Sequence, residues 1–331
     1  MTHWRQSLKL LALFFKNSKH ENVAHQTWHT LLFFLLILLT VFSCAGCGQD
    51  QDELNVYQGV VNLDKKVELP PQLSQLEQNS FKVAVAAIIS PRGTAESYNP
   101  LLEYLGEKLN KKIILIQRRT YREINQLIIE HKVDLAFICT GAYVTSPDKN
   151  SMSLLAIPQV HGKTTYQSYI IVPEYSEAKN LDDLQGKTFA FTDPISNTGY
   201  LYPLFLLQTR QQTPETFFKR TIFTYSHDRS IQAVVSRVAD GAAVDNLVYL
   251  YAIANTPEVK EKTKIIHTSQ EFGMPPVVVS AHTDAAQKRL LKTIFLDMHQ
   301  TANGIKALET LNIDKFVVPN ENLYKKLYSP N

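Results

Sequence analysis

Cysteine is scarce in this chain, and its distribution excludes a disulfide framework. The 331 residues contain three cysteines, of which Cys44 and Cys47 lie near the N-terminus and only Cys139 lies in the body of the protein. One cysteine cannot form an internal disulfide, and the apolar residues before Cys139 are typical of a buried strand. We therefore interpret Cys139 as a small core residue rather than a nucleophile.

The common enzyme motifs are also missing from the body. No G-x-S-x-G elbow, G-x-x-x-x-G-K-[ST] loop or G-x-G-x-x-G turn occurs there, which removes the usual support for hydrolase, NTPase and dinucleotide-binding functions. The histidines lack metal-ligand spacing, because His20 and His25, the nearest match to H-E-x-x-H, have one residue too many between them. We expect no enzymatic activity, no metal and no cofactor.

Excess charge is absent as well. The formal net charge is +3, and Lys and Arg are scattered among Asp and Glu, so no basic stripe for nucleic acid is present. Glycine is sparse at 12 residues, while 44% of residues are hydrophobic and 20% are charged. These values are typical of a folded globular protein, and the length allows two domains.

Residues 1–47 are predicted to be a signal peptide that ends in a lipoprotein cleavage box. Residues 31–42 form an uncharged apolar run of h-region length, shorter than the roughly 20 residues of a spanning helix. The small residues and cysteines that follow resemble a bacterial lipobox. Cys44 lies at the better distance from Val41, whereas Cys47 has the better small residues before it, so either is the predicted lipidation site.

An uncleaved N-terminal anchor helix is the alternative for this segment. Both interpretations place the body outside the cytoplasm, in the periplasm or at the outer face of the cytoplasmic membrane. In the first interpretation, the N-terminal lipid attaches the chain to the membrane.

Beyond the signal segment, residues 48–80 are polar without sustained periodicity and are predicted to be a tether. From Phe81 onward, strand and helix patterns alternate, which predicts parallel α/β lobes. We expect lobe 1 over 81–172, lobe 2 over 173–272, and a return to lobe 1 over 273–331. The expected strands are 82–89, 113–117, 133–139, 154–160, 166–172, 188–192, 221–225, 242–245 and 277–280. The expected helices are 98–109 and 121–130, with further helices starting near Thr198, Arg229, Asn246 and Asp284.

The turn at 193–201 has the composition of an oxyanion site. It delivers two hydroxyls and a glycine to the start of an apolar helix, where amide N–H groups have no partner within the helix and lie at the positive end of its dipole. Ser196 and Thr198 can donate further hydrogen bonds, and Gly199 keeps Cβ bulk away from a ligand. An ordinary N-cap is the alternative, because helix starts favour the same residue types.

Taken in order, these segments resemble the phosphate/phosphite/phosphonate family of periplasmic substrate-binding proteins, which serve ABC importers. The resemblance covers residues 81–325 and rests on residues 89–91, 117–121, 133–137, 140–143, 193–201, 226–228 and 245–247. It implies a type II periplasmic-binding (Venus-flytrap) α/β fold, in which two lobes joined by a hinge close around a ligand. It also implies a small phosphorus oxyanion as ligand, an ABC permease with its ATPase as partners, and a monomer.

The resemblance implies a set of ligand-binding residues in lobe 2. Ser196 and Thr198 would bind the phosphoryl oxygens, with backbone help near Asn197 and Gly199, and His227 would add a further contact. The alternative is that this segment is an ordinary helix start, capped by Ser226 or Asp228.

Two further residues match the family pattern. Tyr166 corresponds to an aromatic residue beside the ligand, with packing in the hinge as its alternative. Asp245 corresponds to an acidic residue opposite the phosphoryl group, with capping of the next helix as its alternative. A carboxylate beside an anion is favourable if the ligand presents a donor, either an amine or the O–H of a singly protonated phosphoryl oxygen.

Lobe 1 is expected to supply the opposite wall, because open α/β sheets bind ligands beyond the carboxyl ends of their strands. Thr140 and Tyr143 follow one predicted strand, Tyr121 follows another, and Tyr98 is a further candidate. One departure from the family pattern concerns residues 274–276, where members that bind aminoalkyl phosphonates have a second acidic residue and this chain reads Met-Pro-Pro. The departure favours a smaller oxyanion such as phosphate, phosphite or methylphosphonate.

The function expected from these observations is that of an extracytoplasmic binding lipoprotein of an ABC importer. The alternative is a ligand-sensing adaptor whose closed form is recognised by a membrane signalling protein. An enzyme on the same fold is the third hypothesis, and the missing catalytic motifs argue against it.

Overall fold

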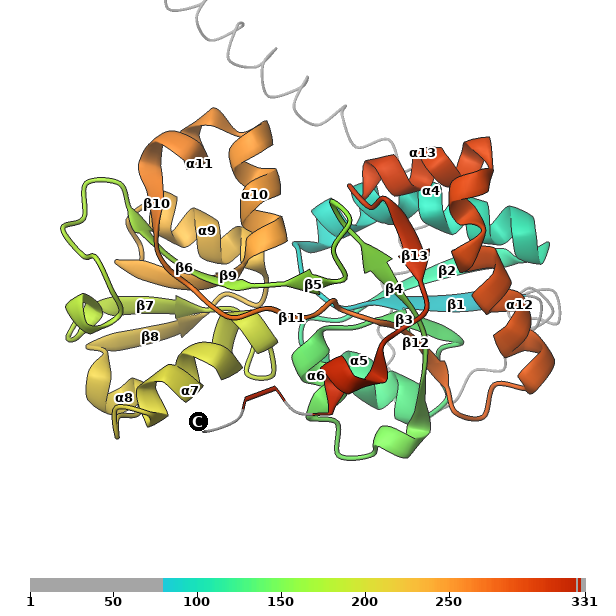
Figure 1. Ribbon diagram of the computed structural model, residues 1–331, viewed down its shortest axis with the longest axis horizontal. Helices are drawn as coiled ribbons and strands as arrows, with labels where there is room; N and C mark the ends of the chain where they lie inside the picture. Colours follow the sequence, from blue (N-terminus) through green and yellow to red (C-terminus); the bar gives the residue numbers. More distant parts are fainter. Residues whose placement is uncertain (1–79, 326, 329–331) are drawn as a thin grey trace, which may run out of the picture. The chain divides into compact units, whose positions relative to one another are not determined.

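The computed structural model describes residues 80–325, 327 and 328 (Figure 1). The predicted signal peptide, both N-terminal cysteines and the predicted tether up to residue 79 lie outside these residues. Among the described residues, no helix combines the length and apolar character needed to cross a membrane.

Lobe 1 is built around a six-stranded sheet with the order β13-β4-β12-β3-β1-β2. Its strands are β1 (Ser80–Val85), β2 (Lys112–Gln117), β3 (Leu135–Phe137), β4 (Met152–Gln159), β12 (Val277–Ser280) and β13 (Lys315–Val317). β1 pairs in parallel with β2 and β3, whereas β12 pairs antiparallel with β3 and β4. The sheet is therefore mixed rather than wholly parallel.

Alternate residues of β1 face opposite layers of helices, as the two-residue period of a strand requires. Phe81, Val83 and Val85 pack against α4 (Pro91–Leu109), α12 (Ala285–Leu296) and α13 (Ala302–Thr310). Ala84 packs on the other face, against α5 (Tyr121–Ile129) and α6 (Thr140–Val144). Short 3-10 turns at Lys149–Ser151, Met298–Gln300 and Glu321–Tyr324 complete the lobe.

Lobe 2 contains a five-stranded sheet with the order β10-β6-β9-β7-β8. Its strands are β6 (Ser168–Pro173), β7 (Thr188–Phe191), β8 (Arg220–Phe223), β9 (Gly241–Asp245) and β10 (Thr263–Thr268). One face packs against α7 (Tyr202–Gln208) and α8 (Pro214–Phe217), and the other packs against α9 (His227–Val235), α10 (Asn246–Asn255) and α11 (Pro257–Lys262). A π-helical turn, η3 (Asn197–Leu201), leads directly into α7, and a 3-10 turn covers Asp182–Leu184.

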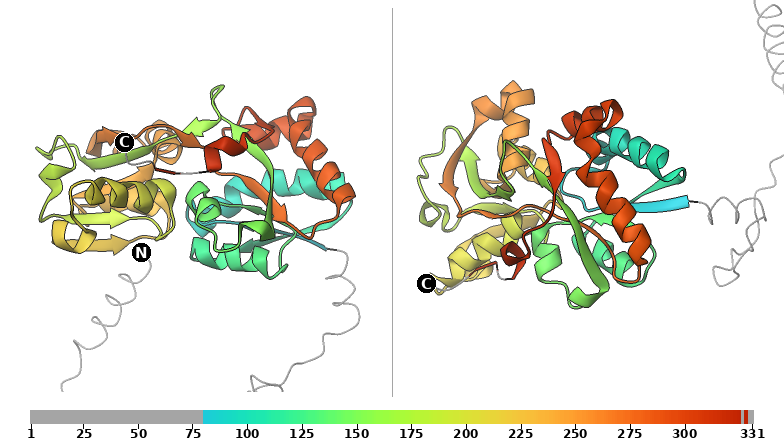
Figure 2. Two further views of the ribbon diagram at one scale, coloured as in Figure 1. Left: turned by 60° about the horizontal axis from the view of Figure 1, so that its bottom comes forward. Right: turned by 45° about the vertical axis from the view of Figure 1, so that its right-hand side comes forward.

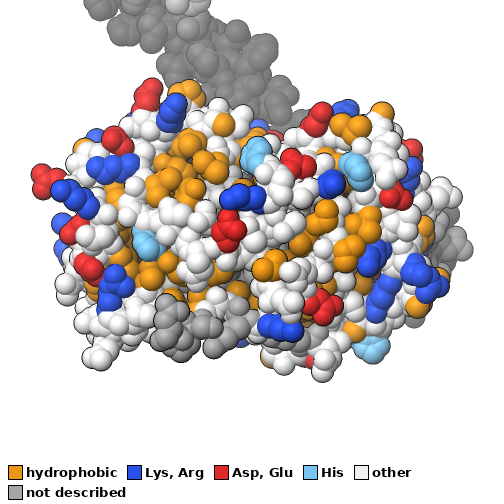
Figure 3. Space-filling model, viewed as in Figure 1, with side chains coloured by type: hydrophobic (Ala, Val, Ile, Leu, Met, Phe, Trp, Pro, Cys, Tyr) orange, Lys and Arg blue, Asp and Glu red, His pale blue; other side chains and the backbone are white. Residues whose placement is uncertain are grey.

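Two chain crossings join the sheets. β5 (Thr165–Tyr166) and β11 (Phe272–Gly273) pair as an antiparallel ribbon between the lobes (Figure 1). The C-terminal segment beyond β13 makes a further connection, since the 3-10 turn at Glu321–Tyr324 packs against α6 of lobe 1 and the Tyr328 ring stacks on Phe205 of α7 in lobe 2. Figure 2 shows the two lobes from two further directions. On the face seen in Figure 3, charged side chains of both signs are interspersed.

The alternation of strands and helices predicted from the sequence is present, with three corrections. β6 pairs with β9 and β10 of the second sheet, so the predicted end of lobe 1 at residue 172 is too late. The strand predicted over 82–89 ends at Val85, because the following residues leave the sheet and reach lobe 2, where Ile88 O accepts a hydrogen bond from His227 N–H at 2.9 Å. α4 begins at Pro91 rather than Tyr98, since proline is well suited to the first turn of a helix.

Candidate ligand-binding site

The carboxyl ends of strands from both sheets converge on one region between the lobes. In lobe 1, β2 leads to Tyr121 at the start of α5, and β3 leads to Thr140 at the start of α6. In lobe 2, β7, β8 and β9 lead to Ser196, His227 and Asp245 at the starts of η3, α9 and α10. This convergence follows from the α/β topology, which places every strand-to-helix turn of this kind at the same edge of its sheet.

Direct hydrogen bonds hold the lobes together around this region. Ser90 N–H donates to both carboxylate oxygens of Asp228, at 3.0 and 3.1 Å. Tyr121 N–H donates to Asp193 Oδ2 at 3.1 Å. The structure therefore shows the lobes in contact, with backbone groups of lobe 1 bonded to side chains of lobe 2.

The lobes approach each other closely at Gly141. A Cβ atom there would contact Ile195 O and would lie 2.6 Å from Asn197 N, both of which belong to the backbone of lobe 2. Asn197 N–H points at the Cys139 thiol, with 3.5 Å between N and Sγ. Burial raises the pKa of that thiol to about 11, so Cys139 is a neutral, buried neighbour of the turn.

Ser196 is the N-cap of η3, as one interpretation of the turn predicted. Its Oγ accepts a hydrogen bond from Gly199 N–H at 3.1 Å. Gly199 itself is packed against lobe 2, because a Cβ atom there would contact the Thr192 side chain. A glycine at this position is therefore required by packing within lobe 2.

His227 is neutral, and its tautomer follows from its contacts. Asp245 N–H donates to His227 Nδ1 at 3.0 Å, so Nδ1 carries no proton and Nε2 carries it. Burial lowers the pKa of His227 to about 3, which keeps the ring in this form at physiological pH. Nε2 lies 3.5 Å from Ser196 Oγ. The histidine therefore directs an N–H donor toward the turn.

These contacts fix the direction of the Ser196 hydroxyl proton. Its oxygen already accepts from Gly199 N–H and faces His227 Nε2–H, so its own O–H is left to donate. Tyr121 lies beside Ser196. Burial raises the pKa of Tyr121 well above its ordinary value, and the interaction with the Ser196 hydroxyl opposes part of that rise.

Two buried hydroxyls in this region have no hydrogen-bond partner among the described residues. They are Tyr121 OH from lobe 1 and Thr198 Oγ1 from lobe 2, and both side chains are almost completely buried. Leaving a hydroxyl buried without a partner costs about 1 to 3 kcal/mol. We call Tyr121, Ser196, Thr198 and His227 the donor cluster. Tyr121 OH and Thr198 Oγ1 have no partner among the described residues, and the Ser196 Oγ–His227 Nε2 contact is long, at 3.5 Å.

Asp245 is the carboxylate beside the donor cluster. Its Oδ1 accepts from Leu247 N–H at 2.8 Å and from Val248 N–H at 3.4 Å, so it caps α10 as the alternative interpretation predicted. Burial nevertheless raises its pKa to about 7, against the opposing effect of these two N–H groups. Burial is the main cause of the raised pKa values of Tyr121 and Tyr166, and the charge of Asp245 adds to both.

Asn197 and Tyr166 are hydrogen-bonded to each other next to the donor cluster. Asn197 Nδ2 donates to Tyr166 OH at 3.2 Å, and Asn197 Oδ1 accepts from Tyr328 OH at 2.6 Å. The two bonds fix the orientation of the Asn197 amide. Tyr328 was not predicted from the sequence, because it lies far along the chain in a segment without a recognisable motif.

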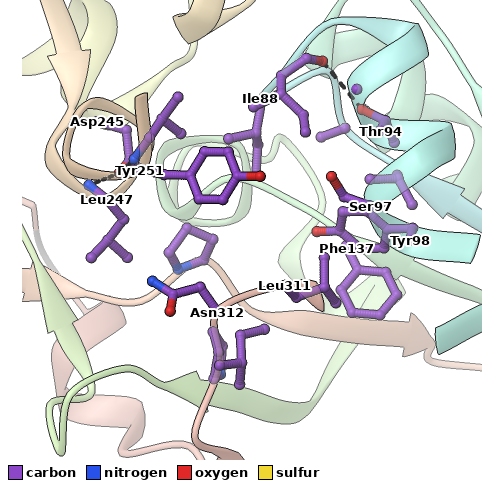
Figure 4. Close-up of a pocket in the computed structure, with 18 of the residues that line it drawn as sticks. Ile88, Thr94, Ser97, Tyr98, Phe137, Asp245, Leu247, Tyr251, Leu311 and Asn312 are labelled. Atoms are coloured by element: carbon purple, nitrogen blue, oxygen red, sulfur yellow. Dashed lines mark hydrogen bonds between the residues drawn. The ribbon is translucent and has the colours of Figure 1, made fainter. Parts of the chain in front are cut away.

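The remaining predicted residues are not part of the donor cluster. Thr140 Oγ1 donates to Gly273 O of the hinge ribbon at 2.8 Å, next to Tyr166. Tyr143 packs edge-on against Tyr324 of the C-terminal segment, with ring centroids 5.6 Å apart. Tyr98 lies edge-on against Phe137 and lines a pocket next to the cluster (Figure 4).

The arrangement suits a tetrahedral oxyanion that carries one proton. The donor cluster consists of neutral O–H and N–H groups, and no Lys or Arg is among the buried residues of the described chain. Hydrogen bonds from neutral donors to a charged acceptor are strong in such a buried setting. The Asp245 carboxylate beside the cluster can accept a hydrogen bond from the protonated oxygen of such an anion, which offsets the repulsion between the two negative charges.

The comparison with known sequences points to one family. A family model described as an ABC transporter, phosphonate, periplasmic substrate-binding protein matches residues 83–324. The phosphonates-binding periplasmic protein of Escherichia coli K12 is 25% identical over 250 residues, which cover 73% of this chain and 73% of that protein. The phosphate-import protein PhnD of Mycolicibacterium smegmatis is 28% identical over 191 residues, covering 54% and 60%.

Solved structures agree on the fold. A binding protein component of an ABC phosphonate transporter from Pseudomonas aeruginosa matches with a TM-score of 0.69 at 23% identity, covering 74% of this chain and 83% of that chain. PhnD1 from Prochlorococcus marinus, in complex with methylphosphonate, matches with a TM-score of 0.67 at 18% identity, covering 75% and 95%. The predicted two-lobed, type II fold is thereby confirmed.

Proposed function

Because the chain belongs to the phosphonate family of periplasmic substrate-binding proteins of ABC transporters, we propose that its donor cluster holds a small phosphorus oxyanion. Members of this family are solute-binding transport proteins rather than enzymes, and this chain is the periplasmic binding component of such a transporter. In the proposal, lobe closure around phosphate, phosphite or a phosphonate produces the form that the permease and its ATPase receive.

The observation that carries the proposal is the pair of unpartnered hydroxyls, Tyr121 OH and Thr198 Oγ1. They come from opposite lobes, and their burial is unfavourable unless an acceptor lies between them. An oxyanion supplies such acceptors. Its binding would therefore stabilise the closed arrangement of the lobes. The gain equals the difference between its binding free energies for the closed and the open form.

Asp245 would select among oxyanions. A singly protonated phosphate or phosphonate can donate its O–H to the carboxylate, whereas sulfate is fully ionised near neutral pH and has no proton to donate. The prolines at 275 and 276 leave an amine-bearing ligand without a second carboxylate there. We therefore expect phosphorus oxyanions without an amine to bind and sulfate to be rejected.

The test removes each unpartnered hydroxyl without changing the shape of its side chain. Thr198→Val and Tyr121→Phe delete hydroxyls that make no hydrogen bond within the described protein, so the stability of the empty protein should not fall. Each should weaken binding of inorganic phosphate or methylphosphonate by about 1.5 to 3 kcal/mol, the range for hydrogen bonds to charged groups, or about 10-fold to 150-fold. Calorimetry on the full chain in lipid nanodiscs, with sulfate in parallel, measures the affinity.

Tyr249→Phe is the matched control. The Tyr249 hydroxyl is bonded to Thr263 Oγ1 at 2.9 Å inside lobe 2, so its removal should lower stability by about 1 kcal/mol and leave phosphate affinity unchanged. If Thr198→Val and Tyr121→Phe instead behave like Tyr249→Phe, the hydroxyls are structural and the proposed site is wrong.

We further propose that the chain is a lipoprotein anchored through Cys44 or Cys47. The lipobox-like sequence supports this, and residues 1–47 would be the signal peptide. Radiolabelled palmitate fed to cells that produce the protein should be incorporated. Cys44→Ser and Cys47→Ser, made separately, should show that one of them abolishes the label. Incorporation that survives in the double variant would contradict the proposal.

A further inference from the structure

A pocket of about 460 Å³ lies between the lobes, directly beside the proposed oxyanion site. Figure 4 shows Tyr251 reaching into it from lobe 2, opposite Ile88, Thr94 and Tyr98 of lobe 1. Ligand pockets are typically about 300 to 1,000 Å³. The pocket is thus large enough for an organic group and is more than a bare tetrahedral oxyanion needs.

Asp245 connects this pocket to the donor cluster. It lines the pocket, and its backbone N–H donates to Nδ1 of His227 in the cluster at 3.0 Å. Ile138 also lines the pocket and precedes Cys139, whose thiol faces Asn197 N–H. A group attached to the phosphorus atom of a bound oxyanion therefore has a route into the pocket past Asp245.

The walls of the pocket are mainly apolar and contain no cation. Neither Lys nor Arg is among the residues that line it, so an anionic head would not be held there. Of its carboxylates, Asp228 is bonded by Ser90 N–H, and Glu96 is paired with Arg92 at the exposed rim. The family position that would suit an amine is occupied here by Pro275 and Pro276, which also line the pocket.

We propose that this pocket holds an apolar alkyl or aryl substituent of a phosphonate whose phosphoryl head lies in the donor cluster. The inference rests on the proposed function, and it deepens that function by naming the class of substrate. Residues of both lobes form the walls, so the substituent would be enclosed as the lobes close.

The test is the affinity of the full chain in lipid nanodiscs for inorganic phosphate and for methyl-, ethyl-, propyl- and phenylphosphonate, measured by calorimetry. Burial of each methylene in an apolar pocket should strengthen binding about fourfold. We therefore expect affinity to rise steadily from methyl- to propylphosphonate and to remain high for phenylphosphonate.

Tyr251→Asp and Leu250→Asp form a matched pair of variants. Both side chains are on α10 and partly exposed, at 53% and 40%, and each substitution adds one negative charge, but only Tyr251 lines the pocket. Tyr251→Asp should remove the gain from methyl- to propylphosphonate, with each affinity expressed relative to the affinity of the same variant for phosphate. Leu250→Asp should retain the full gain.

Three outcomes overturn part or all of this assignment. Affinity that stays flat or falls along the series, with phosphate and methylphosphonate still bound, overturns the apolar subsite and leaves the oxyanion site standing. A gain that persists in Tyr251→Asp overturns the placement of the substituent in this pocket. Failure of the unsubstituted protein to bind any member of the series overturns the oxyanion proposal itself.

Discussion

The Asp245 carboxyl is subject to two opposing effects. Two backbone N–H groups at the start of α10 favour its charged form, while almost complete burial favours its neutral form. Burial prevails, since the pKa is raised to about 7. Near neutral pH the group can therefore lose or gain a proton at little free-energy cost. This property suits a carboxyl group that accepts a hydrogen bond from a phosphoryl O–H.

This balance predicts a pH-dependent contribution to stability. Between about pH 4 and pH 7 the folded protein holds a proton at Asp245 that the unfolded chain, with an ordinary pKa near 3.9, releases. The stabilisation is present at low pH and is lost as pH rises through about 7. Asp245→Asn removes this dependence and keeps a side chain that caps helices well.

We expect the free energy of unfolding of the unsubstituted protein, relative to Asp245→Asn, to fall by about 1.4 kcal/mol per pH unit between pH 5 and 6.5 and to level off above pH 8. Urea denaturation of ligand-free protein at each pH measures it. The difference cancels His227, whose lowered pKa acts in the opposite direction in both proteins. Parallel stability profiles would show that Asp245 is ionised across the whole range.

At the residue scale, the sequence allowed candidate residues to be grouped only where they form a local pattern. Ser196, Thr198, His227 and Asp245 each follow a strand and open a helix, so their grouping follows from α/β topology. Tyr328 has no such signal. Its bond to Asn197 depends on the path of the C-terminal segment across the lobes, which no local pattern encodes.

At the scale of elements, periodicity predicted the strands better than it predicted their sheets. The run that contains β6 is apolar and short, which identifies a strand, but its partners β9 and β10 are distant in sequence. Which sheet receives it depends on where the chain crosses between the lobes. The crossing occurs at the β5–β11 ribbon of two residue pairs, too short to give a periodic signal.

At the helix starts, one residue can both cap the helix and belong to the candidate site. Ser196 caps η3 and Asp245 caps α10, so the alternatives weighed from sequence do not exclude each other. A side-chain oxygen that accepts from the helix leaves a hydroxyl proton, or a second carboxylate oxygen, for another partner. Loss of stability after removing such a side chain is therefore a poor test of its function, and Thr198 is the better target.

For the whole molecule, closure depends on how near the two lobes can come. Gly141 at the start of α6 lies against Ile195 O and Asn197 N, so the lobes meet there backbone to backbone. A methyl group cannot be accommodated by moving a flexible side chain, because both neighbours are main-chain atoms. The space that glycine leaves open is thus a geometric requirement of the closed arrangement and not of either lobe alone.

Gly141→Ala should separate closure from folding. Alanine favours a helix over glycine by about 1 kcal/mol, so lobe 1 should not lose stability, while the closed contact becomes impossible. We expect phosphate affinity to fall at least 100-fold, and we expect small-angle X-ray scattering to show a ligand-induced decrease in the radius of gyration only for the unsubstituted protein. Gly106→Ala in α4 is the control, since its Cβ would lie 3.2 Å from Lys111 O and 3.4 Å from the Ile113 side chain, both within lobe 1. A Gly141→Ala protein that contracts on phosphate addition like the unsubstituted one would show that this contact does not limit closure.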